Sequence, residues 1–338
     1  MRQLCLMLSL TGLRVFGFVS DPWLSHERIH RLTGEPARVD YPVPANQALS
    51  VVTWNIERGE AYDAVLDVLR RLEPDVLLLQ EVDQGCRRTG YRDVARDLAT
   101  ALDMNWVAAG EFQELGEGRS GAPALTGQAI LSRFVIHDAA GLPFKAQDRW
   151  RWSVNPVQPR RGGRLALKAR TGGVIFYNTH IESGHNERLQ QRQMAEIVAD
   201  QARTTDGTPV VIAGDFNNRP APHSLTLKSL ARASFVDALG DAQGRGPTSQ
   251  GERQPIDWIF GKHMSTATGR VVDAAAASDH SPVMTAFGAL RSTERAAQPA
   301  VHAAPALSIR EARAARSPHL TRPQLQRGQV GSEYPLFD

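Results

Sequence analysis

The stretch Val210–Asn217 constrains the fold more than any other part of the chain, because an apolar run ends there in two polar side chains. The small and β-branched residues Val210–Ala213 predict a buried strand. Gly214 permits a sharp turn, and the alternation of side chains along a strand places Asp215 and Asn217 on the same side. A turn rich in Asx residues after a core strand would give the same pattern, so this stretch alone leaves both interpretations open.

Polar residues recur at the ends of other predicted strands. They are Asn55, Glu81 and His180 after apolar runs, Asp257 within a run, and Asp279 and His280 ahead of the last run. Each one alone has an ordinary structural explanation, as a cap, a turn residue or a hydrogen-bonded histidine. Polar groups at the strand ends of an α/β sheet converge on one rim, where such folds bind ligands, so together they predict a single site.

Strands and helices are predicted to alternate from residue 49 onward. Apolar residues three and four positions apart predict helices over 61–72, 94–102 and 189–198. Apolar runs predict strands at 49–54, 76–79, 129–131, 165–169, 174–178, 210–213, 256–260, 270–272 and 283–287. This order of elements indicates an α/β (α+β) chain.

Several segments lack such a pattern. The Gly-rich stretch 113–127 and the stretch 143–163 are predicted to be long surface loops. Residues 1–48 are expected to be an irregular lead-in with a weak signal-like apolar run that is too short to span a membrane. Residues 291–338, rich in Arg, Ala and Pro, are expected to be a disordered tail. The compartment stays open, with the cytoplasm favoured over export.

The +3 net charge of the 338-residue chain comes from its C-terminal end. Residues 291–338 hold seven arginines and four acidic residues, so the rest of the chain is neutral. No broad cationic face for a polyanion is therefore predicted for the body. Cys5 and Cys86 give neither a disulfide framework nor a CxxC pair, and Cys86 is expected to be a small buried residue.

The residue types at the strand ends favour magnesium over zinc. Oxygen atoms of Asn55, Glu81 and Asp279 are hard ligands of the kind that Mg²⁺ prefers, with Mn²⁺ as an alternative. The chain has two cysteines and no HExxH or paired-histidine spacing, which disfavours zinc. His180 and His280 can donate hydrogen bonds to phosphoryl oxygens or exchange protons near neutral pH.

Six short motifs follow one another between residues 49 and 288. They are Thr53–Ile56, Leu79–Glu81, Asn178–Ile181, Gly214–Asn217, Ile256–Ile259 and Ser278–Pro282. In this order and spacing they resemble the motifs of the endonuclease/exonuclease/phosphatase superfamily of Mg²⁺-dependent phosphoesterases, and Ala129–Arg133 and Arg160–Gly162 support the match. The resemblance implies that residues 49–290 form a catalytic domain. It also implies a four-layer α/β/β/α sandwich, with two packed mixed β-sheets flanked by helices.

The resemblance also implies a metal site. In it, Glu81 looks like the main Mg²⁺ ligand, with Asn55 and Asp279 close to the ion. Asn55 and Arg161 are candidates for binding the phosphate. All four residues belong to the motifs or to the supporting segments.

The remaining motif residues resemble the catalytic set. Asp215 looks like the residue that orients or deprotonates the attacking water, and Asn217 and His180 would hold phosphoryl oxygens. Asp257 would orient and charge His280, which would stabilise the transition state or act as the base. The sequence leaves the identity of the base open.

The resemblance implies a phosphodiester hydrolase that attacks phosphorus with an activated water. A nuclease is preferred, a sphingomyelinase-like or other small phosphoesterase is the alternative, and an inactive binding module is the least favoured. Glu57 and Arg58 replace the Asn-Gly of repair enzymes, so abasic-site repair is not expected. The expected partner is nucleic acid or phospholipid, bound by a monomer with no transmembrane span.

Overall fold

The computed structural model describes residues 24–35, 48–148, 159–184, 186–204, 207–219, 224–240, 246–265, 267–274 and 276–288. The N-terminal apolar run and the tail 291–338 lie outside these residues. Among the described residues, no helix has the length and apolar character that a membrane crossing requires.

Two mixed β-sheets form the centre of the fold. The first sheet contains, in spatial order, β1 (Leu32–Gly34), β4 (Asn105–Arg119), β5 (Ala122–Ser132), β3 (Val76–Gln84), β2 (Leu49–Arg58), β14 (Val283–Phe287) and β13 (Ala267–Val271), with β7 (Arg160–Gly162) beside β4. The second sheet contains, in spatial order, β11 (Val236–Asp237), β12 (Asp257–Lys262), β10 (Val210–Asp215), β9 (Val174–His180), β8 (Leu165–Thr171) and β6 (Ile136–Pro143). The pairs β2–β3 and β9–β10 are parallel, and both sheets also contain antiparallel pairs.

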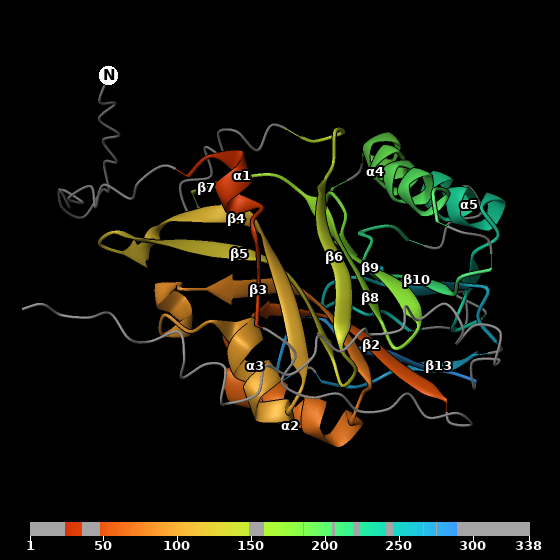
Figure 1. The fold of residues 1–338 in the computed structure, drawn as a ribbon, viewed down its shortest axis with the longest axis horizontal. Helices are drawn as coiled ribbons and strands as arrows, with labels where there is room; N and C mark the ends of the chain where they lie inside the picture. Colours follow the sequence, from red (N-terminus) through yellow and green to blue (C-terminus); the bar gives the residue numbers. More distant parts are fainter. Residues whose placement is uncertain are drawn as a thin grey trace, which may run out of the picture. The chain divides into compact units, whose positions relative to one another are not determined.

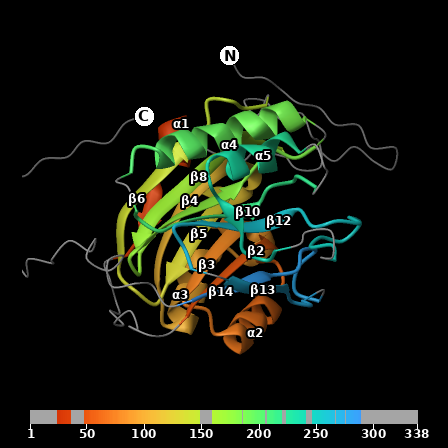
Figure 2. The ribbon, with the colours of Figure 1, turned by 90° about the vertical axis from the view of Figure 1, so that its right-hand side faces the viewer.

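Helices cover the outer faces of both sheets. The helices α2 (Tyr62–Leu72) and α3 (Val94–Leu102) pack on the first sheet, and α4 (Glu187–Gln201) and α5 (Leu225–Arg232) pack on the second. Figures 1 and 2 show the two helix pairs on opposite sides of the strands. The predicted four-layer sandwich is therefore confirmed.

Each central strand contributes side chains to two hydrophobic cores, because successive side chains point to opposite faces of the sheet. In β10, Val211 and Ala213 face the core between the sheets, whereas Val210 and Ile212 face α4 and α5. Strands that are buried on both faces have continuous apolar runs instead of alternating ones. This explains why short apolar runs located most strands correctly.

The predicted loop at 113–127 is wrong. These residues belong to the long hairpin of β4 and β5, and β7 pairs with β4 in the part where the loop was expected. The polar side chains of Gln113 and Glu114 are buried there, and Oε1 of Gln113 accepts a hydrogen bond from the backbone N–H of Leu24. Polar residues that are satisfied by distant partners do not show as strand in a local pattern.

Two further expectations are corrected in part. The stretch 143–163 ends in a strand, because Arg160–Gly162 pairs with β4; residues 149–158 lie outside the described residues. The lead-in is not wholly irregular, because it contains α1 (His26–Ile29) and β1, which pairs with β4. Ile29 is fully buried, and a side chain at Gly110 would overlap its carbonyl oxygen. The segment is therefore packed into the domain.

Candidate active site

Three neighbouring strands of the second sheet carry predicted site residues at the same level. Asp215 is the register partner of His180 across the parallel pair β10–β9 and of Asp257 across the antiparallel pair β10–β12. Gly214, at φ +145°, makes this approach feasible, because a Cβ atom there would overlap the carbonyl oxygen of Thr179. Glycine is the residue that tolerates both the dihedral and the contact.

Asp215 lies at the centre of a buried polar cluster. Its Oδ2 atom is 3.3 Å from Nε2 of His180 and 3.8 Å from Nε2 of His280. From the first sheet, Nδ2 of Asn55 donates a hydrogen bond to the same oxygen at 3.3 Å. Residues separated by up to 225 positions, from both sheets, therefore meet at one carboxylate.

His280 is held by a second carboxylate. Its Nδ1 atom lies 2.9 Å from Oδ2 of the buried Asp257, and the indole N–H of Trp54 donates to its carbonyl oxygen at 2.8 Å. A carboxylate that accepts from Nδ1 fixes the orientation of the ring and turns Nε2 toward Asp215. The predicted pairing of Asp257 with His280 is present in the structure.

The electrostatics of the cluster differ from one group to the next. Burial and the neighbouring Asp257 charge raise the pKa of Asp215 to about 7. Burial opposes the charged form of His280, but the Asp257 and Asp215 carboxylates outweigh it and raise its pKa to about 10. Burial, with the positive charges of Arg164 and His280, holds the pKa of His180 well below its usual range. At neutral pH the cluster thus contains an imidazolium, a neutral imidazole and a carboxyl that can exchange a proton.

Asn217 is fixed by its backbone and by its side chain. Its N–H donates to Oδ1 of Asp215 at 2.9 Å, and its Nδ2 donates to the carbonyl oxygen of Ile181 at 3.1 Å. Its φ of +46° is left-handed, a conformation that asparagine tolerates better than most residues. The backbone of Asn217 is thus held beside the Asp215 carboxylate.

A second group of polar residues borders the cluster on the first sheet. We call it the acidic rim, and it consists of Asn55, Glu57, Glu81 and Asp279. Both β2 and β3 are irregular here, between Asn55 and Arg58 and between Gln80 and Val82, and Glu57, Arg58 and Glu81 all have positive φ. Left-handed non-glycine residues cluster at functional sites, where the surrounding structure enforces them.

The rim joins the remaining predicted metal ligands to the cluster. The N–H of Asp279 donates to Oε2 of Glu57 at 3.1 Å, and the N–H of Glu57 donates to Oδ1 of Asn55 at 3.1 Å. Glu81 lies 3.6 Å from Arg58 and is partly exposed. Glu57 therefore connects Asp279 to Asn55 by two hydrogen bonds. Glu81 lies on the neighbouring strand β3 and contacts Arg58.

In the described part of the chain, acidic and histidine side chains converge where they could bind a cation. Asp215, Asp257 and His280 have ligand atoms within 4.8 Å of one another, but Asp257 and His280 already bond each other. The rim instead offers hard oxygens, and burial together with the charge of Asp279 raises the pKa of Glu57. Oxygen donors of this kind are chemically suited to a hard divalent cation.

Arg161, the remaining predicted residue, lies on β7, which pairs with β4 of the first sheet. Arg160 and Arg161 are successive residues of β7, so their side chains point to opposite faces. The guanidinium of Arg160 lies 4.3 Å from the centre of the Phe112 ring, and its charge helps to lower the pKa of His180. The sequence pattern missed Arg160, because which of two adjacent arginines faces the site depends on the register of β7 against β4.

The sequence pattern also missed Glu57 and two glutamines, Gln190 and Gln193. Glu57 could have been found from its place two residues after Asn55. The glutamines are nearly or fully buried, and they occupy positions of the apolar stripe of α4 together with Met194 and Ile197. Amides in place of apolar residues on a buried helix face are the signal that was available.

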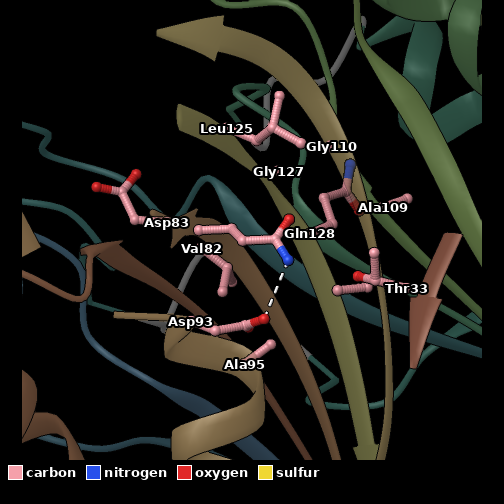
Figure 3. Close-up of a pocket in the computed structure, with 12 residues that line it drawn as sticks. Thr33, Val82, Asp83, Asp93, Ala95, Ala109, Gly110, Leu125, Gly127 and Gln128 are labelled. Atoms are coloured by element: carbon pink, nitrogen blue, oxygen red, sulfur yellow. Dashed lines mark hydrogen bonds between the residues drawn. The ribbon is translucent and has the colours of Figure 1, made fainter. Parts of the chain in front are cut away.

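A small cavity lies away from this cluster. It measures about 20 Å³ and lies among β3, β4 and β5, with Thr33, Asp83, Asp93 and Gln128 in its lining. Figure 3 shows these side chains, and none of the site residues named above is among them. A cavity of this size holds about one water molecule and is too small for a substrate.

Comparisons with known proteins agree with this geometry. A model of the Endonuclease/Exonuclease/phosphatase family matches residues 52–280. An endonuclease/exonuclease/phosphatase from Beutenbergia cavernae is similar at 20% identity and a TM-score of 0.52, over 72% of each chain. One from Bacteroides vulgatus matches at 17% identity and a TM-score of 0.53, over 72% of this chain and 99% of its own.

The human Nocturnin catalytic domain with a bound sulfate anion is also similar. It matches at 18% identity and a TM-score of 0.52, over 75% of this chain and 99% of its own. At these identities the likeness to solved structures establishes the fold alone. No curated protein sequence matches the chain significantly.

Proposed function

The chain belongs to the endonuclease/exonuclease/phosphatase family of phosphoester hydrolases, and we propose that it hydrolyses phosphodiester bonds of nucleic acid with the help of Mg²⁺. One observation carries this proposal: Asn55, His180 and His280 surround the buried carboxylate of Asp215. A base, an amide and two imidazoles around one point are what attack by water on phosphorus requires.

Asp215 is the proposed base for the attacking water. With a pKa of about 7 it is half ionised near neutral pH, which balances availability against proton affinity. Asn217 and Asn55 orient the reacting groups beside it. The three residues are connected by hydrogen bonds in which Asp215 is the acceptor.

The two histidines have different proposed roles. His280 is cationic and held by Asp257, so its Nε2–H stabilises charge that develops on the phosphoryl oxygens. His180 is neutral, and its Nε2 atom lies 3.3 Å from Oδ2 of Asp215, so its proposed role is to hold a phosphoryl oxygen beside that carboxylate. Arg160 adds a positive charge that acts on His180.

Asn55, Glu81 and Asp279 are the proposed ligands of the metal, with Glu57 beside them. A bound Mg²⁺ would neutralise negative charge on the phosphoryl group and orient it for in-line displacement. Burial and the nearby charge of Asp279 raise the pKa of Glu57, and a cation beside these carboxylates would offset both effects.

An extended basic face supports a polymeric substrate. Arg188 and Arg192 of α4 and Lys228 and Arg232 of α5 are exposed. Glu187 and Gln191 of α4 contact Leu225 and Ser229 of α5, so the helices run parallel and the four basic residues project from the same outer side.

The acidic residues of α4 do not neutralise this face. Glu187 accepts a hydrogen bond from the N–H of Leu225, and Glu196 accepts from the N–H groups of Lys145 and Ala146. Asp200 pairs with Lys168. A local face of one sign supports binding of a polyanion, although the body as a whole is neutral.

The test is a substrate panel assayed with Mg²⁺, with Mn²⁺ and with EDTA. It contains bis-(p-nitrophenyl) phosphate, p-nitrophenyl phosphate, plasmid DNA, RNA and sphingomyelin, with His280→Ala as the inactive control. Metal-dependent cleavage of the diester and of nucleic acid is expected. Cleavage of sphingomyelin or of the monoester alone would establish the small-substrate alternative, and no turnover of any substrate would contradict the proposal.

A further inference from the structure

Two glutamines on the inner face of α4 are buried without being part of the hydrophobic core. Gln190 is 3% exposed and Gln193 is fully buried. A buried amide is unfavourable unless it is hydrogen-bonded, and here all the polar atoms of both side chains have partners. Except for Ala146, these partners lie in the loops that follow β9 and β10.

Gln190 joins the loop after β9 to the loop after β10. Its Nε2 atom lies 3.0 Å from the carbonyl oxygen of Glu182, 3.2 Å from that of Gly184 and 3.0 Å from that of Asn217. Its Oε1 atom accepts a hydrogen bond from Nδ2 of Asn218 at 3.1 Å. One side chain thus contacts the segments that follow both His180 and Asp215.

Gln193 holds the first of these loops from the other side. Its Oε1 accepts from the N–H of Glu182 at 2.9 Å, and its Nε2 donates to the carbonyl oxygen of Ala146 at 2.8 Å. Both backbone polar groups of Glu182 are therefore bonded to α4. The loop after His180 is fixed in place as a result.

The residue that Gln190 contacts in the second loop is under conformational constraint. Asn217 has a left-handed φ of +46°, and its N–H must reach Oδ1 of Asp215. Such conformations persist where surrounding contacts over-determine them. The bond from Gln190 to the carbonyl oxygen of Asn217 supplies one of these contacts, and the bond from the Trp258 indole to the carbonyl oxygen of Asn218 supplies another.

We propose that Gln190, supported by Gln193, is a positioning residue that holds Asn217 and the Asp215 carboxylate in their reactive geometry. It does this through hydrogen bonds that connect the loop after β9 and the loop after β10 to α4. As far as it concerns catalysis, the inference rests on the proposed function. Gln190 bonds only to backbone and to Asn218 among the described residues, so it acts through Asn217 and not on the substrate.

The first test needs no activity. Gln190→Met keeps the length of the side chain and removes its hydrogen bonds, and Gln191→Ala is the matched control, because Gln191 makes one 3.5 Å contact to Ser229. Hydrogen exchange of residues 181–184 and 216–219 is expected to speed up in Gln190→Met and to stay at the wild-type rate in the control. Unchanged exchange in these segments would overturn the proposal.

The second test separates positioning from stability. At a temperature where all variants are folded, Gln190→Met is expected to lower kcat by about 10–100-fold with KM within about threefold, because small displacements of catalytic groups cost this much. A double-mutant cycle with Asn217→Ala should show strong non-additivity, since both changes disturb the same group. Effects on kcat that simply multiply would contradict the inference.

A milder variant covers the case in which Gln190→Met does not fold. Gln190→Asn retains the amide with a shorter reach, so intermediate exchange rates and an intermediate kcat are expected. Wild-type values of both in this variant would count against the proposal. If the wild-type protein hydrolyses none of the panel substrates, the proposed function fails, and the exchange experiment still decides the role of Gln190 in the loops.

Discussion

Nδ1 of His280 lies 2.9 Å from Oδ2 of Asp257, and both side chains are buried. The carboxylate fixes the orientation of the imidazole ring and contributes to the high pKa of His280. Asp257→Asn should therefore lower the pKa of His280 and reduce kcat by about 10²-fold, within the usual range for acid–base groups. The measurement is the pH profile of kcat, together with the ¹⁵N chemical shifts of His280.

The control for this change is Asp237→Asn on β11, the neighbouring strand of β12. Asp237 pairs in register with Phe260, away from His280, so its substitution should leave the pH profile unchanged. An unaltered profile in Asp257→Asn would show that the dyad does not control the ionisation of His280.

Asp215→Asn is expected to abolish most activity without loss of stability. Burial and the Asp257 charge raise the pKa of Asp215 from 3.8 to about 7, so the destabilisation by this group grows between these pH values and is largest above pH 7. An amide removes this unfavourable charge and can still accept the hydrogen bond from Asn217. At pH 8 the melting temperature should match or exceed that of the wild type, while kcat falls by about 10³-fold. Retention of wild-type turnover would refute the role of Asp215.

Glu81→Gln should weaken metal binding. The substitution removes a charge from the rim but keeps the shape of the side chain, so the Mg²⁺ concentration for half-maximal activity should rise by about tenfold or more. Titration calorimetry with Mg²⁺ measures the same change without substrate. Glu60→Gln is the matched control, since Glu60 also lies 3.6 Å from Arg58 and is 46% exposed. Equal metal affinities in both variants would exclude Glu81 as a ligand.

Much of the fold could be predicted because its strands are buried on both faces. Val210–Ala213 contributes alternate residues to two cores, so every position is apolar and the run stands out from its neighbours. The hairpin of β4 and β5 could not be predicted in this way. Glu111, Gln113 and Glu114 are buried there as polar residues, and their bonding partners lie far away in sequence.

The candidate site could likewise be predicted only in part from the sequence. Asp215 and His180 could be predicted to meet, because both end neighbouring apolar runs, and parallel strands bring such ends together. The roles of Glu57 and Arg160 depended on a strand irregularity and on a pairing register, neither of which leaves a local pattern. The same holds for Gln190, whose partners are backbone carbonyls.

The docking of the segment that contains α1 should weaken in acid. Nδ1 of His30 lies 3.0 Å from the carbonyl oxygen of Gly110, and burial lowers the pKa of His30 below its ordinary 6.5. The undocked segment therefore takes up a proton before the docked one does, so docking is at full strength above pH 6.5 and is lost progressively below it. Hydrogen exchange of residues 24–34, corrected for intrinsic rates, should rise between pH 7.5 and pH 5.5. In His30→Gln, which can still donate to Gly110 but does not titrate, this rise should disappear.

Gly214→Ala tests whether the close approach of β10 to β9 is obligatory. A Cβ atom at φ +145° would overlap the carbonyl oxygen of Thr179, and neither backbone can move without disturbing the pair of Asp215 with His180. The loss should be about 3 kcal/mol or more, from dihedral strain and backbone overlap together. Gly240→Ala is the control, because Gly240 has φ +74° with open space around it, and it should cost about 1 kcal/mol. Urea denaturation gives both values, and equal midpoints for the two variants would mean that the strands have room to separate.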